Sequence, residues 1–283
     1  MHKFENDRLL VYIYMLYHNQ HDISTWSKPI NQMNKYLVVL NYRTFIALAI
    51  ATVTLWLSYI FNFSYNIDLT LVSIAIIFPL VFNIRGSFQR RERALEYLSQ
   101  FRSALLTIYY YFNNSPKLTD DDKKEITNIL LEISNTLPLH LGRSDHDTKE
   151  LDNTIQKVFS FITDKNEFIP ARYKVKIIRF LFDLHESVEN LHAIHVHRTI
   201  ISLKAYCEYS IYIFPLIYVP TIIYHVGMET SKWIAFFTVL FTEFILISLF
   251  NIQDQMEYPF DNIGMDDIRL DTFKFERGTF NDV

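Results

Sequence analysis

The feature that most constrains this chain is a set of four long stretches that are almost free of formal charge. They cover residues 44–67, 69–84, 209–228 and 233–253, and the last contains one acid, Glu243. A bilayer core about 30 Å thick needs roughly 20 apolar residues of helix, with about 17 as the lower limit. Three stretches are long enough, and 69–84 reads as the membrane part of a helix that continues into water. The alternative is a soluble all-α protein with four buried helices, although core helices seldom run so far without charge.

Residues that form turns are scarce in the whole chain. There are 5 Gly and 8 Pro among 283 residues, where average usage would give about 34, which favours long helices over a sandwich or barrel. The glycines are too far apart for a dinucleotide-binding fingerprint, a P-loop or a nucleophile elbow. The single Cys207 excludes an internal disulfide and a cysteine-rich zinc site. Because the net charge is −4, we expect no nucleic-acid partner.

The lysines and arginines predict how the spans are oriented. The connections at 64–67 and 226–231 are short and carry neither residue. Basic residues gather near the other ends of the spans: Lys28, Lys35, Arg43, Arg85, Arg90, Arg91, Arg93, Arg198 and Lys204. The positive-inside rule then places the N-terminus, the middle of the chain and the C-terminus in the cytoplasm. The first residues lack the features of a signal peptide.

The middle of the chain reads as a set of helices outside the membrane. An amphipathic stretch over 85–112 ends in a turn, and Thr119 with the three aspartates that follow predicts a helix that runs to about Pro138. Another helix is expected over about 147–163. Pro170 suits the first turn of a helix that can run unbroken toward the third span.

The expected fold class is therefore all-α, with four transmembrane helices and a helical cytoplasmic region. The expected segments are an N-terminal cytoplasmic segment (1–36), transmembrane helices 1 and 2 (37–84), the cytoplasmic helical region (85–206), transmembrane helices 3 and 4 (207–250) and a cytoplasmic tail (251–283).

Two groups of polar residues could carry chemistry. His185, His192 and His195 share one face of a helix, His197 points elsewhere, and Glu189 lies on a compatible face for a metal ion. The alternative is a set of polar or interface histidines at the inner membrane surface. Glu243, within the fourth span, is either a functional acid or the donor of an interhelical hydrogen bond.

An apolar stripe marks the second span. Ile74, Phe78 and Phe82 are four residues apart and line one helix face, as lipid-facing, core or pore-lining residues would. Pro79 frees a backbone carbonyl, which neighbouring helices or water must satisfy. A water-filled axis beside the stripe is one way to supply that water.

The C-terminal segment 251–271 resembles the bestrophin family of pentameric ion channels. The family's last span leads into an acidic stretch, then Pro-Phe, then a second acidic motif. The counterparts here are Asp254, Gln255, Glu257, Pro259, Phe260, Asp266 and Asp267. In the second span, Phe82, Phe88, Arg90 and Ala94 keep the places of a family motif. Counting back from that motif, the resemblance puts the family's hydrophobic neck at Ile74, Phe78 and Phe82.

The resemblance implies a homopentamer in a bacterial inner membrane that conducts small anions such as chloride, or cations, and contacts lipids. It implies a second constriction near Ile194 and no cofactor. The acidic run of the calcium clasp in animal members is interrupted here, so calcium gating is not expected. We do not expect an enzyme. The hypotheses from other classes are a membrane-embedded metalloenzyme that uses the His185–His197 stretch and a non-conducting scaffold or sensor.

Overall fold

The structure is a computed structural model that describes residues 40–143, 147–197, 200–227, 232–261 and 267–275. Within these residues the chain is all-α and has no strand, which confirms the predicted fold class. The elements are α2 (Tyr42–Ile60), α3 (Thr70–Asn113), α4 (Asp120–Gly142), α5 (Lys149–Asp164), α6 (Ala171–Val196), α7 (Ile201–Val226), α8 (Lys232–Met256) and a short 3-10 helix, η2 (Leu270–Phe273). The predicted segment 1–36 lies outside the described residues.

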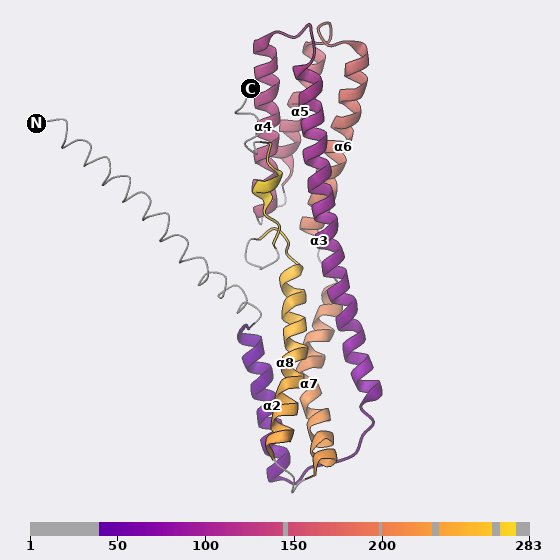
Figure 1. Cartoon of the computed structure of the whole chain (residues 1–283), viewed down its shortest axis with the longest axis vertical. Helices are drawn as coiled ribbons and strands as arrows, with labels where there is room; N and C mark the ends of the chain where they lie inside the picture. Colours follow the sequence, from indigo (N-terminus) through magenta and orange to yellow (C-terminus); the bar gives the residue numbers. More distant parts are fainter. Residues whose placement is uncertain (1–39, 144–146, 198–199, 228–231, 262–266, 276–283) are drawn as a thin grey trace, which may run out of the picture.

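The molecule is elongated and consists of two helix bundles joined end to end (Figure 1). The span bundle contains α2, α7, α8 and the first half of α3, and the head bundle contains α4, α5, α6 and the second half of α3. The 44-residue α3 therefore belongs to both bundles, as expected of a short span that continues into water. Four helical segments, which include α2, α3, α7 and α8, are long and apolar enough to cross a membrane. The chain is an integral membrane protein.

Small side chains let the helices of the span bundle approach closely. Ala47 and Ala51 on α2 are completely buried in the core that α2 shares with α3, α7 and α8. Between α3 and α7, the Asn83 side-chain amide donates to the sulfur of Cys207 at 3.4 Å. This bond gives a buried amide a partner inside an otherwise apolar core.

The head bundle has a separate core, to which α3 and α6 contribute most. Phe101, Leu105 and Ile108 on α3 are buried against Leu181 and Leu184 on α6 and against residues of α4 and α5. These helices are amphipathic, and the apolar face of each is the one that packs in this core. α3 therefore continues well beyond its membrane-spanning part and contributes to this second core.

The predicted start of α4 is confirmed. Thr119 accepts a hydrogen bond from the backbone N–H of Asp122, and the Asp122 carboxylate accepts from the backbone N–H of Thr119. Lys165, at the end of α5, binds the same carboxylate at 2.6 Å. The lysine and the threonine together lower the pKa of Asp122 to about 2. The capping box thus also ties α4 to the end of α5.

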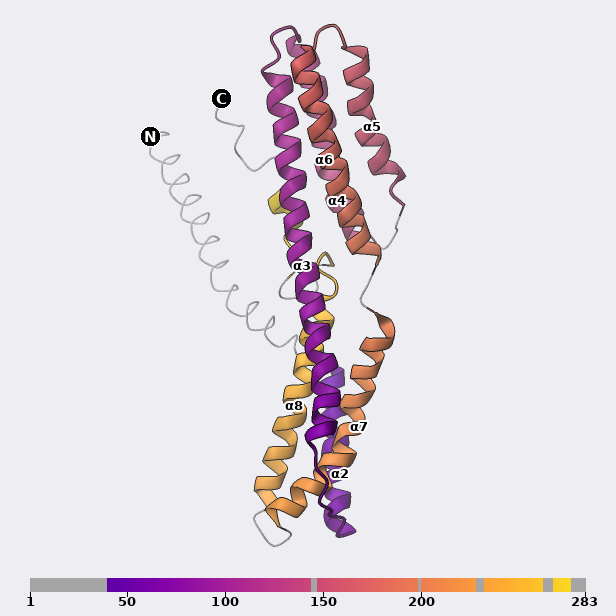
Figure 2. The same cartoon turned by 90° about the vertical axis from the view of Figure 1, so that its right-hand side faces the viewer.

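Two helix ends differ from the prediction. α4 continues past Pro138 to Gly142 because Leu137 and Leu141 are both buried in the head core, and their packing outweighs the one hydrogen bond that proline removes. The helix that begins after Pro170 ends at Val196 and does not run unbroken into the third span (Figure 2). Its last turn is capped by α3, since Arg90 donates to the Ile194 carbonyl and so satisfies a helix end.

Candidate functional site

The apolar stripe of the second span lies on an open face of α3. Ile74, Phe78 and Phe82 are 54%, 61% and 51% exposed, and the rings of Phe78 and Phe82 meet edge to face with centroids 4.6 Å apart. Residues on the other face of the same helix, Ile76 and Leu80, are buried in the span bundle. One side of α3 therefore packs in the span bundle, and the other side is open to lipid or to a partner.

The carbonyl that Pro79 frees has a protein donor. Proline at 79 removes the N–H that would bond to the Ala75 carbonyl four residues earlier. The Tyr206 hydroxyl of α7 donates to this Ala75 carbonyl at 3.1 Å. A water-filled axis is therefore not needed to satisfy the freed carbonyl. In the same way, Tyr65 lies within 3.4 Å of the Leu216 carbonyl, which Pro220 frees in α7.

Beyond Phe82, the same face of α3 becomes polar. Arg85, Gln89 and Arg93 follow at helical spacing, and all three are exposed. Because α3 is continuous, the three apolar side chains and the polar ones that follow form one uninterrupted line along the molecule. Glu96 is the next residue on this line.

Ile194 lies in the last turn of α6, where α6 meets α3. Its side chain is half-buried and packs against the head core, and its carbonyl accepts from Arg90. A cavity of about 220 Å³ opens beside it, and the lining includes Arg90, His195 and Phe260. The residue expected at the second constriction thus lies at the junction of the two bundles.

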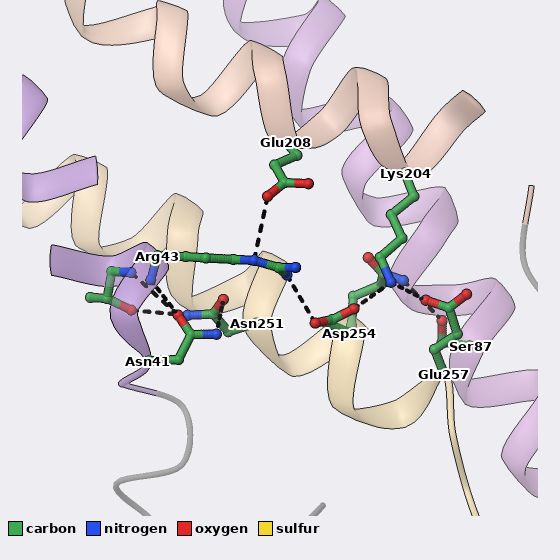
Figure 3. Close-up of polar contacts among 10 residues, drawn as sticks. Asn41, Arg43, Ser87, Lys204, Glu208, Asn251, Asp254 and Glu257 are labelled. Carbon is green, nitrogen blue, oxygen red and sulfur yellow. Dashed lines mark hydrogen bonds and ion pairs between the residues drawn. The ribbon is translucent and has the colours of Figure 1, made fainter. Parts of the chain in front are cut away.

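A network of polar contacts joins four helices at this junction (Figure 3). We call it the junction network; it comprises Asn41, Arg43, Thr44, Ser87, Lys204, Glu208, Asn251, Gln253, Asp254 and Glu257.

Asp254 is central in the junction network. It binds Arg43 of α2 at 2.9 Å and also binds Lys204 of α7. Lys204 reaches Glu257 as well, at 2.6 Å, and Arg43 reaches Glu208 at 3.4 Å. Nearby, Asn251 of α8 donates to the Thr44 hydroxyl and accepts from the Asn41 amide. Two basic and three acidic side chains therefore pair with one another at one end of the span bundle.

The segment that carries the C-terminal motif is fixed to both bundles. Glu257 belongs to the junction network, and Pro259 and Phe260 are buried, with Phe260 in the head core. The Pro259 carbonyl accepts from the backbone N–H of Ile268 at 2.8 Å. Gln255 and Asp267 are half-buried, and Asp266 lies outside the described residues. Further on, the backbone N–H of Phe275 donates to the Ser134 hydroxyl at 2.6 Å.

The histidines at positions 185, 192, 195 and 197 do not form one site. His192 lies 3.0 Å from His140 of α4, between ring nitrogens, and His195 bonds to the Arg143 carbonyl at 2.9 Å. His185 lies apart, 3.6 Å from Glu189. His197, just beyond the helix end, is exposed. The shared face predicted for three histidines is thus divided between two different surroundings.

Glu243 of α8 is completely buried in the span bundle. Neither carboxylate oxygen has a hydrogen-bond partner among the described residues, so no interhelical hydrogen bond from this acid is seen there.

Sequence reasoning missed the residues that complete these contacts. Arg43 and Lys204 served only as markers of orientation, although a basic residue at the edge of a charge-free stretch also needs a counter-ion. His140 lies 52 residues from its partner His192, and no periodic pattern connects them.

No family model and no curated protein sequence matches this chain. Solved structures do. The crystal structure of a bacterial bestrophin homolog from Klebsiella pneumoniae, solved by Zn-SAD phasing, has a TM-score of 0.69 and 13% identity, over 82% of this chain and 93% of that chain. A mutant structure of that homolog has a TM-score of 0.70 and 13% identity, over 84% and 94%.

A second mutant structure of the same homolog has a TM-score of 0.69 and 14% identity, over 82% of this chain and 91% of that chain. The likeness extends over both bundles because it covers more than four fifths of the chain. The resemblance seen in the sequence is confirmed at the level of the fold: the chain has the fold of the bacterial bestrophin homologs.

Proposed function

We propose that the chain is one subunit of a bestrophin-type ion channel, a homopentamer that conducts small anions such as chloride along its central axis. The observation that carries the proposal is the exposed stripe of Ile74, Phe78 and Phe82 on α3, opposite a buried face. A single stripe cannot enclose a pore, so conduction needs several copies around an axis with head-to-tail contacts.

In such a ring, the three stripe residues form three stacked apolar constrictions, the neck. Successive rings are about 6 Å apart, since four residues of helix rise by that amount. Narrow apolar rings hold little water and can gate by dewetting, and the positive edges of Phe rings favour a passing anion. No covalent chemistry and no cofactor is required.

The rest of α3 supports conduction of anions. Arg85 and Arg93 are exposed on the line that leaves the neck, and positive charge in a confined path raises the local concentration of anions. Ile194, at the junction of the bundles, forms the second constriction. The head bundle extends the path on the cytoplasmic side.

The placement of charges supports cytoplasmic termini and a cytoplasmic head bundle. Arg43, Arg85 and Lys204 lie near the junction of the two bundles, whereas the connection at 64–67 at the opposite end carries no basic residue. Exposed side chains such as Phe45, Trp56 and Phe237 contact lipids of a bacterial inner membrane.

Reconstitution tests the proposal directly. The full chain, purified in detergent, should have the mass of a pentamer, and in planar bilayers it should carry current that reverses near the chloride equilibrium potential under a KCl gradient. A stable monomer, or a ring without conductance, contradicts the channel. Current that reverses near the potassium potential leaves the channel in place but contradicts anion selectivity.

A further inference from the structure

Three side chains from two helices of the head bundle meet at its surface. Asp152 lies in the first turn of α5, and His185 and Glu189 are one turn apart on α6. One ligand atom from each lies within 4.8 Å of the other two. The imidazole nitrogen of His185 and a carboxylate oxygen of Glu189 are 3.6 Å apart. We call this set the α5–α6 cluster.

We propose that the α5–α6 cluster binds a transition-metal dication of the zinc type. Tetrahedral zinc holds nitrogen and oxygen ligands at about 2.0–2.2 Å, which puts ligand atoms roughly 3.4 Å apart. The His185–Glu189 pair, at 3.6 Å, is close to this separation. The ligand atom of Asp152 lies within 4.8 Å of both, so side-chain rotations can close the site. Exposure of all three residues leaves the remaining coordination positions to water.

The donor set also selects the kind of ion. Two carboxylates supply negative charge, and one imidazole adds a nitrogen donor that Mg²⁺ and Ca²⁺ seldom use in proteins, because both prefer oxygen ligands. Zinc, cobalt and nickel accept imidazole and carboxylate together. The cluster therefore binds Zn²⁺ in preference to Mg²⁺ and Ca²⁺.

A neighbouring residue already orients one ligand. The Thr148 hydroxyl donates to Oδ2 of Asp152 at 2.8 Å, which restricts how the carboxylate turns toward α6. Hydrogen bonds of this kind around a metal ligand typically strengthen binding by about 10–100-fold. An ion held in the cluster links α5 to α6 and thereby restrains a helix that packs on the outside of the head bundle.

Zinc binding by the purified full chain tests the proposal. After removal of metals with a chelator, the wild type is titrated with ZnCl₂ in a calorimeter, and bound zinc is counted by elemental analysis. D152N, H185N and E189Q should each bind one zinc fewer per chain, or bind that ion at least about tenfold more weakly. D152N and E189Q preserve side-chain size, and H185N shortens a side chain at an exposed position, so folding is retained.

Two control variants change residues outside the cluster, one on α6 and one on α7. E186Q changes an exposed acid of α6 outside the cluster, and H225N changes an exposed histidine of α7. Both should bind zinc as the wild type does. Equal stoichiometry and affinity in the wild type, the cluster variants and the controls overturn the proposal, as does a wild type that takes up no zinc. Neither outcome depends on whether the protein conducts ions.

Discussion

Arg43 and Asp254 join the start of α2 to the end of α8 across 211 residues of sequence, with guanidinium Nη1 and carboxylate Oδ2 2.9 Å apart. The side chains are 20% and 27% exposed, so water screens the pair only in part. Asp254 also binds Lys204, and the segment that follows it carries Phe260 into the head core. Through these two contacts, Asp254 joins three spans to the segment that leads into the tail.

The first prediction concerns this shared carboxylate. Because D254N removes the carboxylate that Arg43 and Lys204 share, we expect the free energy of unfolding to fall by about 1–2 kcal/mol. The melting temperature in a thermal unfolding scan should fall with it. D271N is the control, since Asp271 pairs with Lys274 but its side chain is 85% exposed. That variant should change stability by no more than about 0.5 kcal/mol. Equal melting temperatures for both variants would contradict the assigned role of Asp254.

The second prediction concerns the donor at the proline of α3. Y206F removes the hydroxyl that satisfies the Ala75 carbonyl, and this should lower stability by about 1–3 kcal/mol because the carbonyl lies inside a span. Y209F is the control and should have little effect, because Tyr209 on the same helix is 67% exposed, against 45% for Tyr206. Thermal unfolding in one detergent compares the two.

A double-mutant cycle makes this test specific. In P79A, the backbone N–H at position 79 can again donate to the Ala75 carbonyl, so Y206F should cost less in that background. If Y206F costs the same in the wild-type and P79A backgrounds, the two residues are not coupled, and the explanation is wrong.

The third prediction concerns the tail anchor. Phe260 is 3% exposed in the head core, so F260A should destabilise the protein by about 3–5 kcal/mol through lost burial and the resulting cavity. Phe159 on α5 is 39% exposed and gives a matched control that should cost much less. Limited proteolysis should also cut the F260A tail sooner. A tail that stays as stable in F260A as in F159A would refute docking.

The fourth prediction is a pH dependence at the start of α4. Lys165 and Thr119 lower the pKa of Asp122 to about 2, below its ordinary value of 3.8. A group with a lowered pKa stabilises the fold above its ordinary pKa, and this contribution is lost as the pH falls toward 2. The melting temperature of the wild type should therefore exceed that of D122N at pH 5, and the difference should narrow between pH 4 and pH 2.

The neighbouring Asp121 supplies the control for this pH dependence. Its side chain is 97% exposed, so D121N should follow the wild type at every pH. A difference in melting temperature between the wild type and D122N that stays constant down to pH 2 would contradict this explanation. It would mean that these contacts do not hold Asp122 in its charged form.

The sequence predicted the features that depend on local patterns. The four spans follow from stretches without charge, the start of α4 follows from Thr119 and the acids after it, and the length of α3 follows from an apolar stretch joined to an amphipathic one. The end of α4 was misplaced because Pro138 is a strong local signal, whereas the burial of Leu141 depends on other helices.

The contacts between distant residues could not be predicted in this way. A basic residue at the end of a span suits a lipid headgroup as well as a protein carboxylate, so the sequence could not pair Arg43 with Asp254. Asp152 approaches His185 only because α5 and α6 pack in one bundle, and helical periodicity relates residues on one helix alone. The family motif located Phe260, and the structure supplied its surroundings.

Ile74, Phe78 and Phe82 are proposed to form the gate of a pore, and the alternative is that they face lipid. Removal of the neck side chains widens the constriction and weakens the dewetted barrier. The triple variant I74A/F78A/F82A should therefore show a higher single-channel conductance or lose its closures. α8 offers a control with the same residue types, because Ile234, Phe237 and Phe241 are likewise exposed on one helix.

Single-channel recording of the wild type, I74A/F78A/F82A and I234A/F237A/F241A in the same bilayer is the most direct test. We expect altered conductance or gating in the α3 variant and wild-type currents in the α8 variant. Wild-type conductance and gating in the α3 variant, with the ring still assembled, would contradict the assignment of the neck.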